Sequence, residues 1–153
     1  MDVSGTIESI LAQKTGPIWS VSPDATVYDA IALMAEKNIG ALIVMENDNL
    51  VGIISERDYS RKVMLKGKTS RDSYVREIMT TELITAHPRE TVEDCLRFMT
   101  DKHIRHLPVM AEGRLRGIIS IGDLVKQVIS AQSATLAQLQ DYIAGGYPSS
   151  ASR

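Results

Sequence analysis

Cysteine is almost absent from this chain of 153 residues, in which Cys95 is the only thiol. A single cysteine excludes an intramolecular disulfide and any metal site built from several thiolates. No apolar run approaches the ~20 residues that a membrane-spanning helix needs. The first residues also lack the basic segment and apolar stretch of a secretory signal, so we expect a cytoplasmic protein that does not enter a membrane.

Motifs of known catalytic and phosphate-binding loops are missing too. The sequence contains no Gly-x-Gly-x-x-Gly, no Walker-type loop and no nucleophile elbow. His103 and His106 have no third metal ligand at a convincing spacing. Basic residues are scattered and the net charge is -2, so nucleic acid is not an expected partner. We therefore expect no enzyme and no required cofactor.

What the sequence does contain is an internal duplication. Residues 23–63 align without a gap on residues 88–128, at an offset of 65, with 17 identities in 41 positions. The longest identical block is Gly52-Ile53-Ile54-Ser55 against Gly117-Ile118-Ile119-Ser120. An apolar content of 44% with 24% charged residues is typical of a globular protein. The chain is therefore read as two copies of one small unit.

Each copy predicts a strand, a helix, two strands and a second helix. Pro and Thr precede the first helix, in which apolar residues recur at helical spacing. Asn, Asp and Gly between the later strands suit hairpin turns. The expected strands are 18–21, 41–45 and 50–55 in the first copy, and 83–86, 106–110 and 115–120 in the second.

The predicted domain boundaries follow from this duplication. Residues 1–65 form the first copy with an N-terminal helix, 66–74 a polar linker, and 75–130 the second copy. Leu136, Leu139 and Ile143 predict a further amphipathic helix over 131–145, which we expect to pack on the module or on a dimer mate. Residues 146–153 are expected to form a flexible tail.

The repeated unit, which ends in Gly-Ile-Ile-Ser-x-x-Asp, resembles the CBS (cystathionine-β-synthase) domain, and two in tandem resemble a Bateman module. The resemblance implies an α+β fold: two βαββα CBS repeats related by a pseudo-two-fold axis and packed sheet to sheet, plus the C-terminal helix. It also implies a homodimer. It further implies clefts between the repeats that hold AMP, ADP, ATP, S-adenosylmethionine or NAD(H).

The two Ser-x-x-Asp segments are the first candidate site residues. A carboxylate at a helix start can accept hydrogen bonds from both ribose hydroxyls, and the serine hydroxyl can meet phosphate. The resemblance places Asp58 and Asp123 at the ribose and Ser55 and Ser120 near phosphate. The same spacing also fits a capping box, in which these residues only stabilise the helix start.

Arg105 and His106 distinguish the second copy, because Gly40 and Ala41 are their counterparts in the first. Two potential cations at the start of a buried strand are hard to explain by packing, and the resemblance directs them toward phosphates. Alternatively, Arg105 pairs with a carboxylate and His106 forms a local hydrogen bond. Arg57, inside the first Ser-x-x-Asp segment, is a weaker phosphate candidate since solvation also explains it.

Further side chains are expected near an adenine ring on the strength of the resemblance. These are Ile18, Ser20, Ile84, Thr85 and Ile118. The expected function is therefore a regulatory module that binds an adenine nucleotide and acts on an unidentified effector protein. Two alternatives stay open: a structural dimeric adaptor without a ligand, and a module for S-adenosylmethionine.

Overall fold

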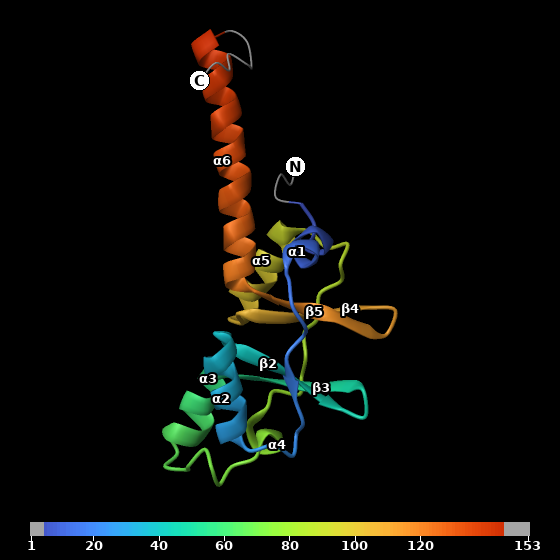
Figure 1. Ribbon diagram of the computed structural model, residues 1–153, viewed down its shortest axis with the longest axis vertical. Coiled ribbons are helices and arrows are strands. Elements are labelled where there is room, and N and C mark those ends of the chain that lie inside the picture. The colour runs from blue at the N-terminus through green and yellow to red at the C-terminus, as the bar shows by residue number, and fades with distance from the viewer. Residues whose placement is uncertain (1–4, 146–153) are drawn as a thin grey trace. The chain divides into compact units, whose positions relative to one another are not determined.

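The central helices of the two copies begin and end alike in the computed structural model, which describes residues 5–145 (Figure 1). These helices are α2 (Val27–Lys37) and α5 (Val92–Lys102). The side chain of Thr26 caps α2 and that of Thr91 caps α5, each by accepting the N–H of the residue three positions later at 3.1 and 3.0 Å. Each helix ends at a residue with φ of 56°. The predicted helix starts are confirmed.

Each copy also contains the expected hairpin. The strands are β2 (Ala41–Glu46) and β3 (Asn49–Ser55) in the first copy, and β4 (His106–Ala111) and β5 (Arg114–Ser120) in the second. Both turns have two successive residues with positive φ: Asn47 and Asp48 at 53° and 64°, and Glu112 and Gly113 at 54° and 75°. Positive φ at both central positions gives the twist that two-residue hairpins need. The strand ends lie within one residue of those predicted.

The first strands of the copies are shorter than predicted. In the first copy β1 (Ser20–Val21) pairs in parallel with β2, opposite Ile43 and Val44. In the second copy the expected strand reduces to one parallel bridge, between Ala86 and Val109. Pro108 stands at the position equivalent to Ile43 and has no N–H to donate, although its carbonyl accepts the N–H of Ala86 at 2.8 Å.

The helices that follow the hairpins differ in length. In the first copy α3 (Glu56–Tyr59) continues into the π-helix η1 (Ser60–Met64), and the chain turns away at Gly67 with φ of 73°. In the second copy the equivalent position is Gln132, and α6 (Ile121–Gly145) runs without a break. One helix therefore replaces the two that the sequence predicted, because no glycine or proline interrupts residues 123–143. The predicted flexible tail, 146–153, lies outside the described residues.

Two short helices complete the cores. Each precedes one copy in sequence but packs against the other copy. α4 (Val75–Ile78) lies against the first copy, where the Val75 N–H donates to the Ala25 carbonyl at 2.9 Å. α1 (Ile7–Gln13) lies against the second copy, where the Ile7 N–H donates to the Glu90 carbonyl at 2.9 Å. The two helices thus make equivalent contacts with opposite copies.

The chain accordingly forms two compact units that differ from the repeats in sequence. The first-copy unit contains residues 16–85 and 110–118, and the second-copy unit contains 5–15, 86–109 and 119–145. Within the described residues no helix is long and apolar enough to span a bilayer. The core of the first-copy unit is formed by Val27, Ala30, Met34, Leu42, Val44, Ile54, Val63, Val75 and Ile78.

The glycine of the repeated Gly-Ile-Ile-Ser block has a steric reason in the first copy. A Cβ at Gly52 would lie 2.9 Å from Met79 Sδ and 3.0 Å from the Thr80 carbonyl oxygen. That carbonyl cannot retreat freely, because it accepts the Ile53 N–H at 3.1 Å. The position therefore requires glycine.

We predict that Gly52→Ala lowers the free energy of unfolding by about 1–3 kcal/mol, the usual cost of overpacking. Urea denaturation followed by circular dichroism measures it. Gly122→Ala is the matched control: its added Cβ has only Ser120 Oγ nearby, at 3.6 Å, and alanine favours the helix by up to ~1 kcal/mol. Equal stability of the wild type and Gly52→Ala would contradict the steric argument.

Candidate functional site

The two Ser-x-x-Asp segments form capping boxes in both copies. In the first, the Ser55 N–H donates to Asp58 Oδ2 at 2.9 Å and the Asp58 N–H donates to Ser55 Oγ at 3.2 Å. In the second, the Ser120 N–H donates to Asp123 Oδ2 at 2.8 Å and the Asp123 N–H donates to Ser120 Oγ at 3.1 Å. Both carboxylates are thereby fixed at a helix start, where free N–H groups and the helix dipole favour negative charge.

The cations that reach these carboxylates come from different places. Asp58 Oδ1 pairs with Lys62 Nζ at 3.0 Å, one turn along the same helix. Glutamine replaces that lysine at position 127 of the second copy. There the cation is Lys14, just beyond α1, whose Nζ lies 2.8 Å from Asp123 Oδ2. The Asp58 side chain is 13% exposed and that of Asp123 is 27% exposed, so Asp123 is the more accessible carboxylate.

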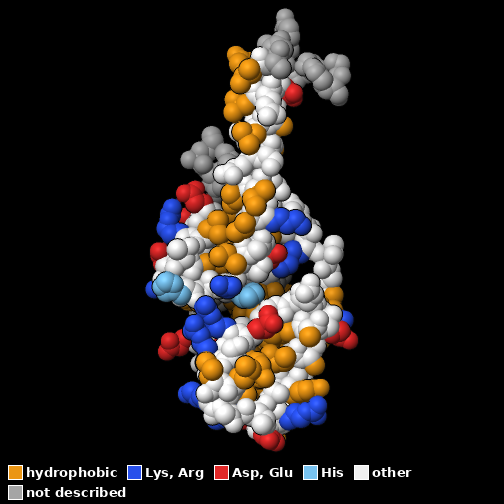
Figure 2. Space-filling model, turned by 90° about the vertical axis from the view of Figure 1, so that its left-hand side faces the viewer, with side chains coloured by type: hydrophobic (Ala, Val, Ile, Leu, Met, Phe, Trp, Pro, Cys, Tyr) orange, Lys and Arg blue, Asp and Glu red, His pale blue; other side chains and the backbone are white. Residues whose placement is uncertain are grey.

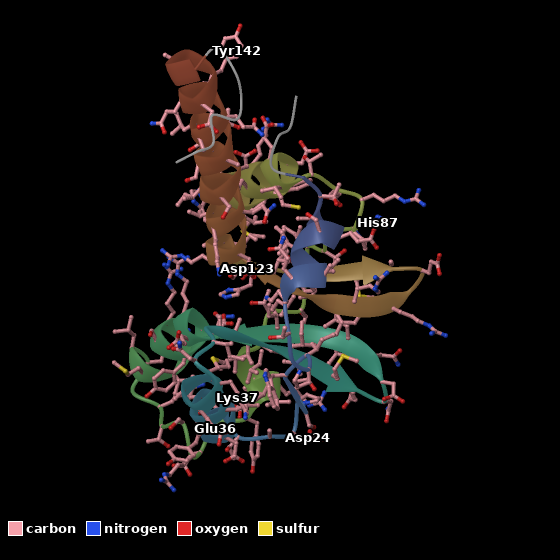
Figure 3. The ribbon with its side chains drawn as sticks, turned by 45° about the horizontal axis from the view of Figure 1, so that its top comes forward. Asp24, Glu36, Lys37, His87, Asp123 and Tyr142 are labelled. Atoms are coloured by element: carbon pink, nitrogen blue, oxygen red, sulfur yellow. The ribbon has the colours of Figure 1, made fainter. Side chains whose placement is uncertain are left out.

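The surroundings of Asp123 keep it ionised. Burial alone would raise its pKa, but the hydrogen bonds from Lys14 and Ser120 outweigh burial and lower the pKa below the ordinary 3.8. Figure 3 shows Asp123 in the first turn of α6. A carboxylate that stays charged at neutral pH is a strong hydrogen-bond acceptor.

Arg105 and His106 lie at the same helix start. The carbonyl of Arg105 accepts the N–H of Ile121 at 2.8 Å. This hydrogen bond joins the residue before β4 to the first residue of α6. Arg105 is exposed, and no ion pair joins it to a carboxylate within residues 5–145. His106 is half-buried. Burial lowers its pKa below 6.5; Asp123 opposes this effect, while Lys14 and Arg105 reinforce it.

Lys14, Arg105, His106, Ser120 and Asp123, here called the α6 cluster, all belong to the second-copy unit. The equivalent first-copy position is built alike, since the Gly40 carbonyl accepts the Glu56 N–H at 3.1 Å. It lacks the two potential cations of the second copy, however, because Gly40 and Ala41 stand in place of Arg105 and His106. The α6 cluster thus combines one fixed carboxylate with three potential cations.

The remaining predicted site residues lie in the first-copy unit. Arg57 is an exposed residue of α3, as expected for a solvated side chain as much as for a phosphate ligand. Ser20 and Thr85 are exposed, and Ile84 and Ile118 are half-buried. Ile18 is 40% exposed, which leaves apolar surface open next to β1. A contact of these residues with an adenine ring stays a prediction.

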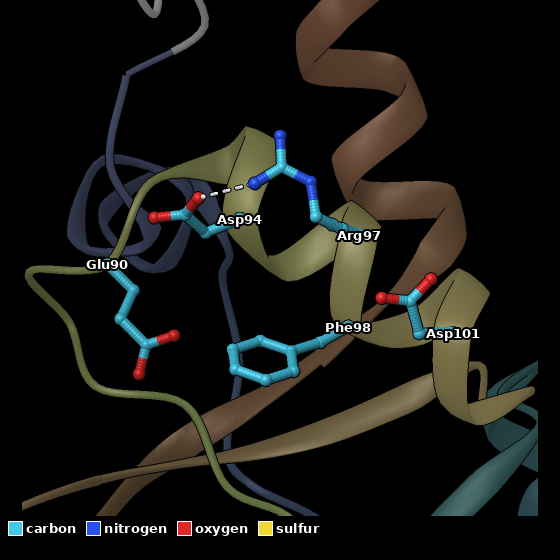
Figure 4. Close-up of a pocket in the computed structure, with 5 residues that line it drawn as sticks. All are labelled: Glu90, Asp94, Arg97, Phe98 and Asp101. Carbon is cyan, nitrogen blue, oxygen red and sulfur yellow. Dashed lines mark hydrogen bonds and ion pairs between the residues drawn. The ribbon is translucent and has the colours of Figure 1, made fainter.

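A separate surface pocket lies on α5, away from the α6 cluster in sequence (Figure 4). Arg97 pairs there with Asp94 at 3.5 Å and with Glu93 at 3.3 Å. The pocket is lined by Glu90, Asp94, Arg97, Phe98 and Asp101.

No group of three or more His, Cys, Asp and Glu side chains in the described part of the chain could hold a metal ion.

Comparison with known proteins agrees with this repeated architecture. The sequence profile of the CBS domain matches the chain twice, over residues 8–65 and 75–130. The chain belongs to the CBS domain family. It is an α+β protein with two CBS repeats and a C-terminal helix, which confirms the fold class expected from sequence.

Individual CBS proteins resemble the chain over most of its length. CBS domain-containing protein CBSX3, mitochondrial, from Arabidopsis thaliana is 43% identical over 135 residues, which cover 85% of this chain and 65% of that protein. The structure of a CBS-domain protein from Burkholderia ambifaria MC40-6 has a TM-score of 0.80 and 47% identity, covering 82% of this chain and 94% of that one. This chain therefore spans about two thirds of the length of the Arabidopsis relative, and its own compartment stays a prediction.

A third relative is the CBS domain pair of protein MJ0100, solved in complex with 5′-methylthioadenosine and S-adenosyl-L-methionine. It has a TM-score of 0.71 and 26% identity, and covers 83% of this chain and 97% of that one. CBS pairs of this kind are typically regulatory modules. Adenosine-containing ligands are thus known for a protein of the same fold.

Lys14 is the residue of the α6 cluster that sequence reasoning missed. It stands in the short insertion before the first strand, Lys14-Thr15-Gly16, which has no counterpart in the second copy. The insertion was a detectable signal, because an unmatched segment in a duplicated chain marks a place where the copies differ. Its partner Asp123 is 109 residues away, and no local pattern connects them.

The lowered pKa of His106 predicts a pH dependence of stability. The folded state binds the proton on His106 less readily than the unfolded state does. The contribution of neutral His106 to the free energy of unfolding is therefore fully present above the ordinary pKa of 6.5 and is lost as pH falls below it. Urea denaturation at about pH 7.5 and about pH 5.5 measures the loss. His106→Ala, which copies Ala41, should reduce it. His103→Asn, which copies Asn38 at the same φ of 56°, is the control and should leave the loss unchanged; the reverse pattern would contradict the assignment.

Proposed function

We propose that this CBS pair is a regulatory sensor that binds an adenine nucleotide, AMP, ADP, ATP or NAD(H), with the α6 cluster holding its ribose and phosphates. The observation that carries the proposal is the charge of that cluster. Lys14 pairs with Asp123, and the charges of Asp123, Lys14 and Arg105 all act on His106. Arg105 forms no ion pair with a carboxylate within the described residues. An anionic ligand would supply the missing negative charge.

Asp123 is suited to the ribose. Its Oδ2 already accepts the Ser120 N–H and the Lys14 ammonium group, which orient the carboxylate rigidly. The Lys14 side chain is 39% exposed, and an ion pair at such exposure contributes only ~0–1 kcal/mol. Ribose hydroxyls can therefore compete with Lys14 for the carboxylate at little cost, and the released ammonium can turn to phosphate.

S-adenosylmethionine is the second candidate, favoured by the MJ0100 complex. Its adenosine would suit Asp123 equally well. Its sulfonium carries positive charge, however, which the cations of Lys14 and Arg105 disfavour. The cluster thus supports a phosphorylated ligand over a sulfonium ligand.

The proposed role is non-catalytic. The residues of the α6 cluster can bind a ligand, neutralise the charge of its phosphates and fix its orientation. All of these are roles in ligand binding. The output of such a sensor would be a change in its contacts with an effector protein of unknown identity. A ligand at ~100 times its Kd adds ~2.7 kcal/mol to the free energy of unfolding and so raises the melting temperature. If adenine compounds at millimolar concentration leave the melting temperature unchanged, the protein is a structural adaptor without a ligand.

Asp123→Ala is expected to weaken nucleotide binding by roughly tenfold to a hundredfold, since charge-assisted hydrogen bonds contribute ~1.5–3 kcal/mol each. Calorimetric titration measures the affinity, and urea denaturation without ligand measures the lost cap, about 1 kcal/mol. Asp58→Ala removes the equivalent cap in the first copy, and the same titration on it asks whether the first copy also holds a ribose. A 2′,3′-dideoxy nucleotide should bind the wild type weakly and lose little more in Asp123→Ala. Equal binding of dideoxy and ordinary nucleotides would restrict Asp123 to capping.

The double substitution Arg105→Gly with His106→Ala gives the second copy the residues of the first. We expect it to weaken AMP binding by roughly tenfold or more, at 1.5–3 kcal/mol for a charged hydrogen bond, and to leave adenosine almost unaffected. Thermal shift and calorimetry with AMP, adenosine and S-adenosylmethionine measure this difference. Equal losses for AMP and adenosine would remove both residues from the phosphate role.

A further inference from the structure

Helix α6 carries, from Val125 to Ile143, an apolar stripe that the rest of the described chain leaves exposed. Val125, Ile129, Leu136, Leu139 and Ile143 are between 43% and 78% exposed. Every described residue from 132 to 143 is exposed. Figure 1 shows α6 extending past α1 and α5 of the same unit, and Figure 2 shows hydrophobic side chains along this extension. Of the two packing surfaces expected for this helix, its own module and a dimer mate, the module does not cover the outer half.

The spacing of the stripe is that of a coiled coil. Positions 125, 129, 132, 136, 139 and 143 are separated alternately by four and three residues, and only position 132, a glutamine, is polar. An average spacing of 3.5 residues keeps one face of a helix against another helix that follows the same rule. Such a stripe needs a long partner helix with matching periodicity, and a small globular surface does not provide one.

Charge favours a second copy of the same helix. Between Gln127 and Ile143 the helix has one charged residue, Asp141, which falls outside the stripe in the heptad. The positions that flank the stripe in this stretch, 128, 133, 135, 140 and 142, are uncharged as well. Two identical helices can therefore approach without like-charge repulsion, and no charge pattern selects a different partner.

Gln132 decides the direction of the pairing. In a parallel, in-register pair it meets Gln132 of the second copy, and the two amides can hydrogen-bond. In an antiparallel pair centred on the stripe it would face Leu136 and lose its hydrogen bonds, which is costly for a buried amide. A single polar residue in an apolar seam is a known device for fixing register.

We infer that α6 pairs with α6 of a second copy as a parallel two-stranded coiled coil, with Gln132 in the seam. This dimerisation surface goes beyond nucleotide sensing and does not depend on it. It is also separate from the α6 cluster, which occupies the first turn of the helix.

Disulfide formation tests the pairing directly on the full chain. Gln132→Cys places a thiol in the seam, where the two Cα atoms of a parallel pair lie within disulfide range, whereas Ala134→Cys places it on the opposite face. The native Cys95 does not interfere, because it is buried and its pKa is raised to about 12 by burial and by Glu90. Gln132→Cys should form a covalent dimer at least about tenfold faster than Ala134→Cys, since pairing raises the effective thiol concentration.

Positive charge introduced into the apolar seam gives a second test of the pairing. Adding Leu136→Lys and Leu139→Lys to Gln132→Cys should abolish the rapid crosslink. The matched control, Ala134→Lys with Gln138→Lys, adds the same charge outside the seam and should preserve it. A Gln132→Cys crosslink no faster than that of Ala134→Cys, or one that survives lysines at 136 and 139, would overturn the inference. Because crosslinking reports on the seam itself, dimerisation elsewhere on the chain cannot mimic the expected result.

Discussion

Backbone hydrogen bonds between a short helix and the start of a longer one complete each core of this protein. A unit of about 50 residues buries too little apolar surface to be stable on its own, and here an additional short helix packs on each copy. Val27 and Val75 exchange such bonds with neighbours on the other's segment, and so do Ile7 and Val92. The same contacts fix where α2 and α5 begin, and hence where the hairpins and the capped helices behind them lie.

The proposed binding site is built on the capped helix start of the second copy. The Ser-x-x-Asp segment has a structural task in both copies, so its presence alone says little about ligands. The difference between the copies is more informative. The first has Gly40, Ala41 and a lysine on the same helix, whereas the second has Arg105, His106 and a lysine from a distant segment. A duplicated framework has thus retained its caps while its charges have diverged.

Sequence patterns predicted the elements that depend on local chemistry. Threonine caps, turns with positive φ and the Ser-x-x-Asp boxes are decided within a few residues, and all occur where the duplication placed them. The continuity of α6 was also decided locally, by the absence of a breaker. The ion pair between Lys14 and Asp123 and the docking of α1 on the second copy depend on contacts between distant residues, which no local pattern encodes. Pro108 lies between these cases, because its missing donor is visible in sequence but its parallel partner is not.

The docking of α1 also sets an order of events during synthesis. Residues 16–85, which supply most of the first-copy unit, can leave the ribosome together and begin to fold. Ile7 is made earlier, yet its backbone partner is Glu90, so at 5–20 residues per second α1 waits about 4–17 s for that partner alone. During that interval Ile7 and Ile10, both buried in the finished protein, are apolar side chains of a nascent chain. Helix α1 is thus translated before the first-copy unit but buried after it, and a chaperone would have long access to this segment.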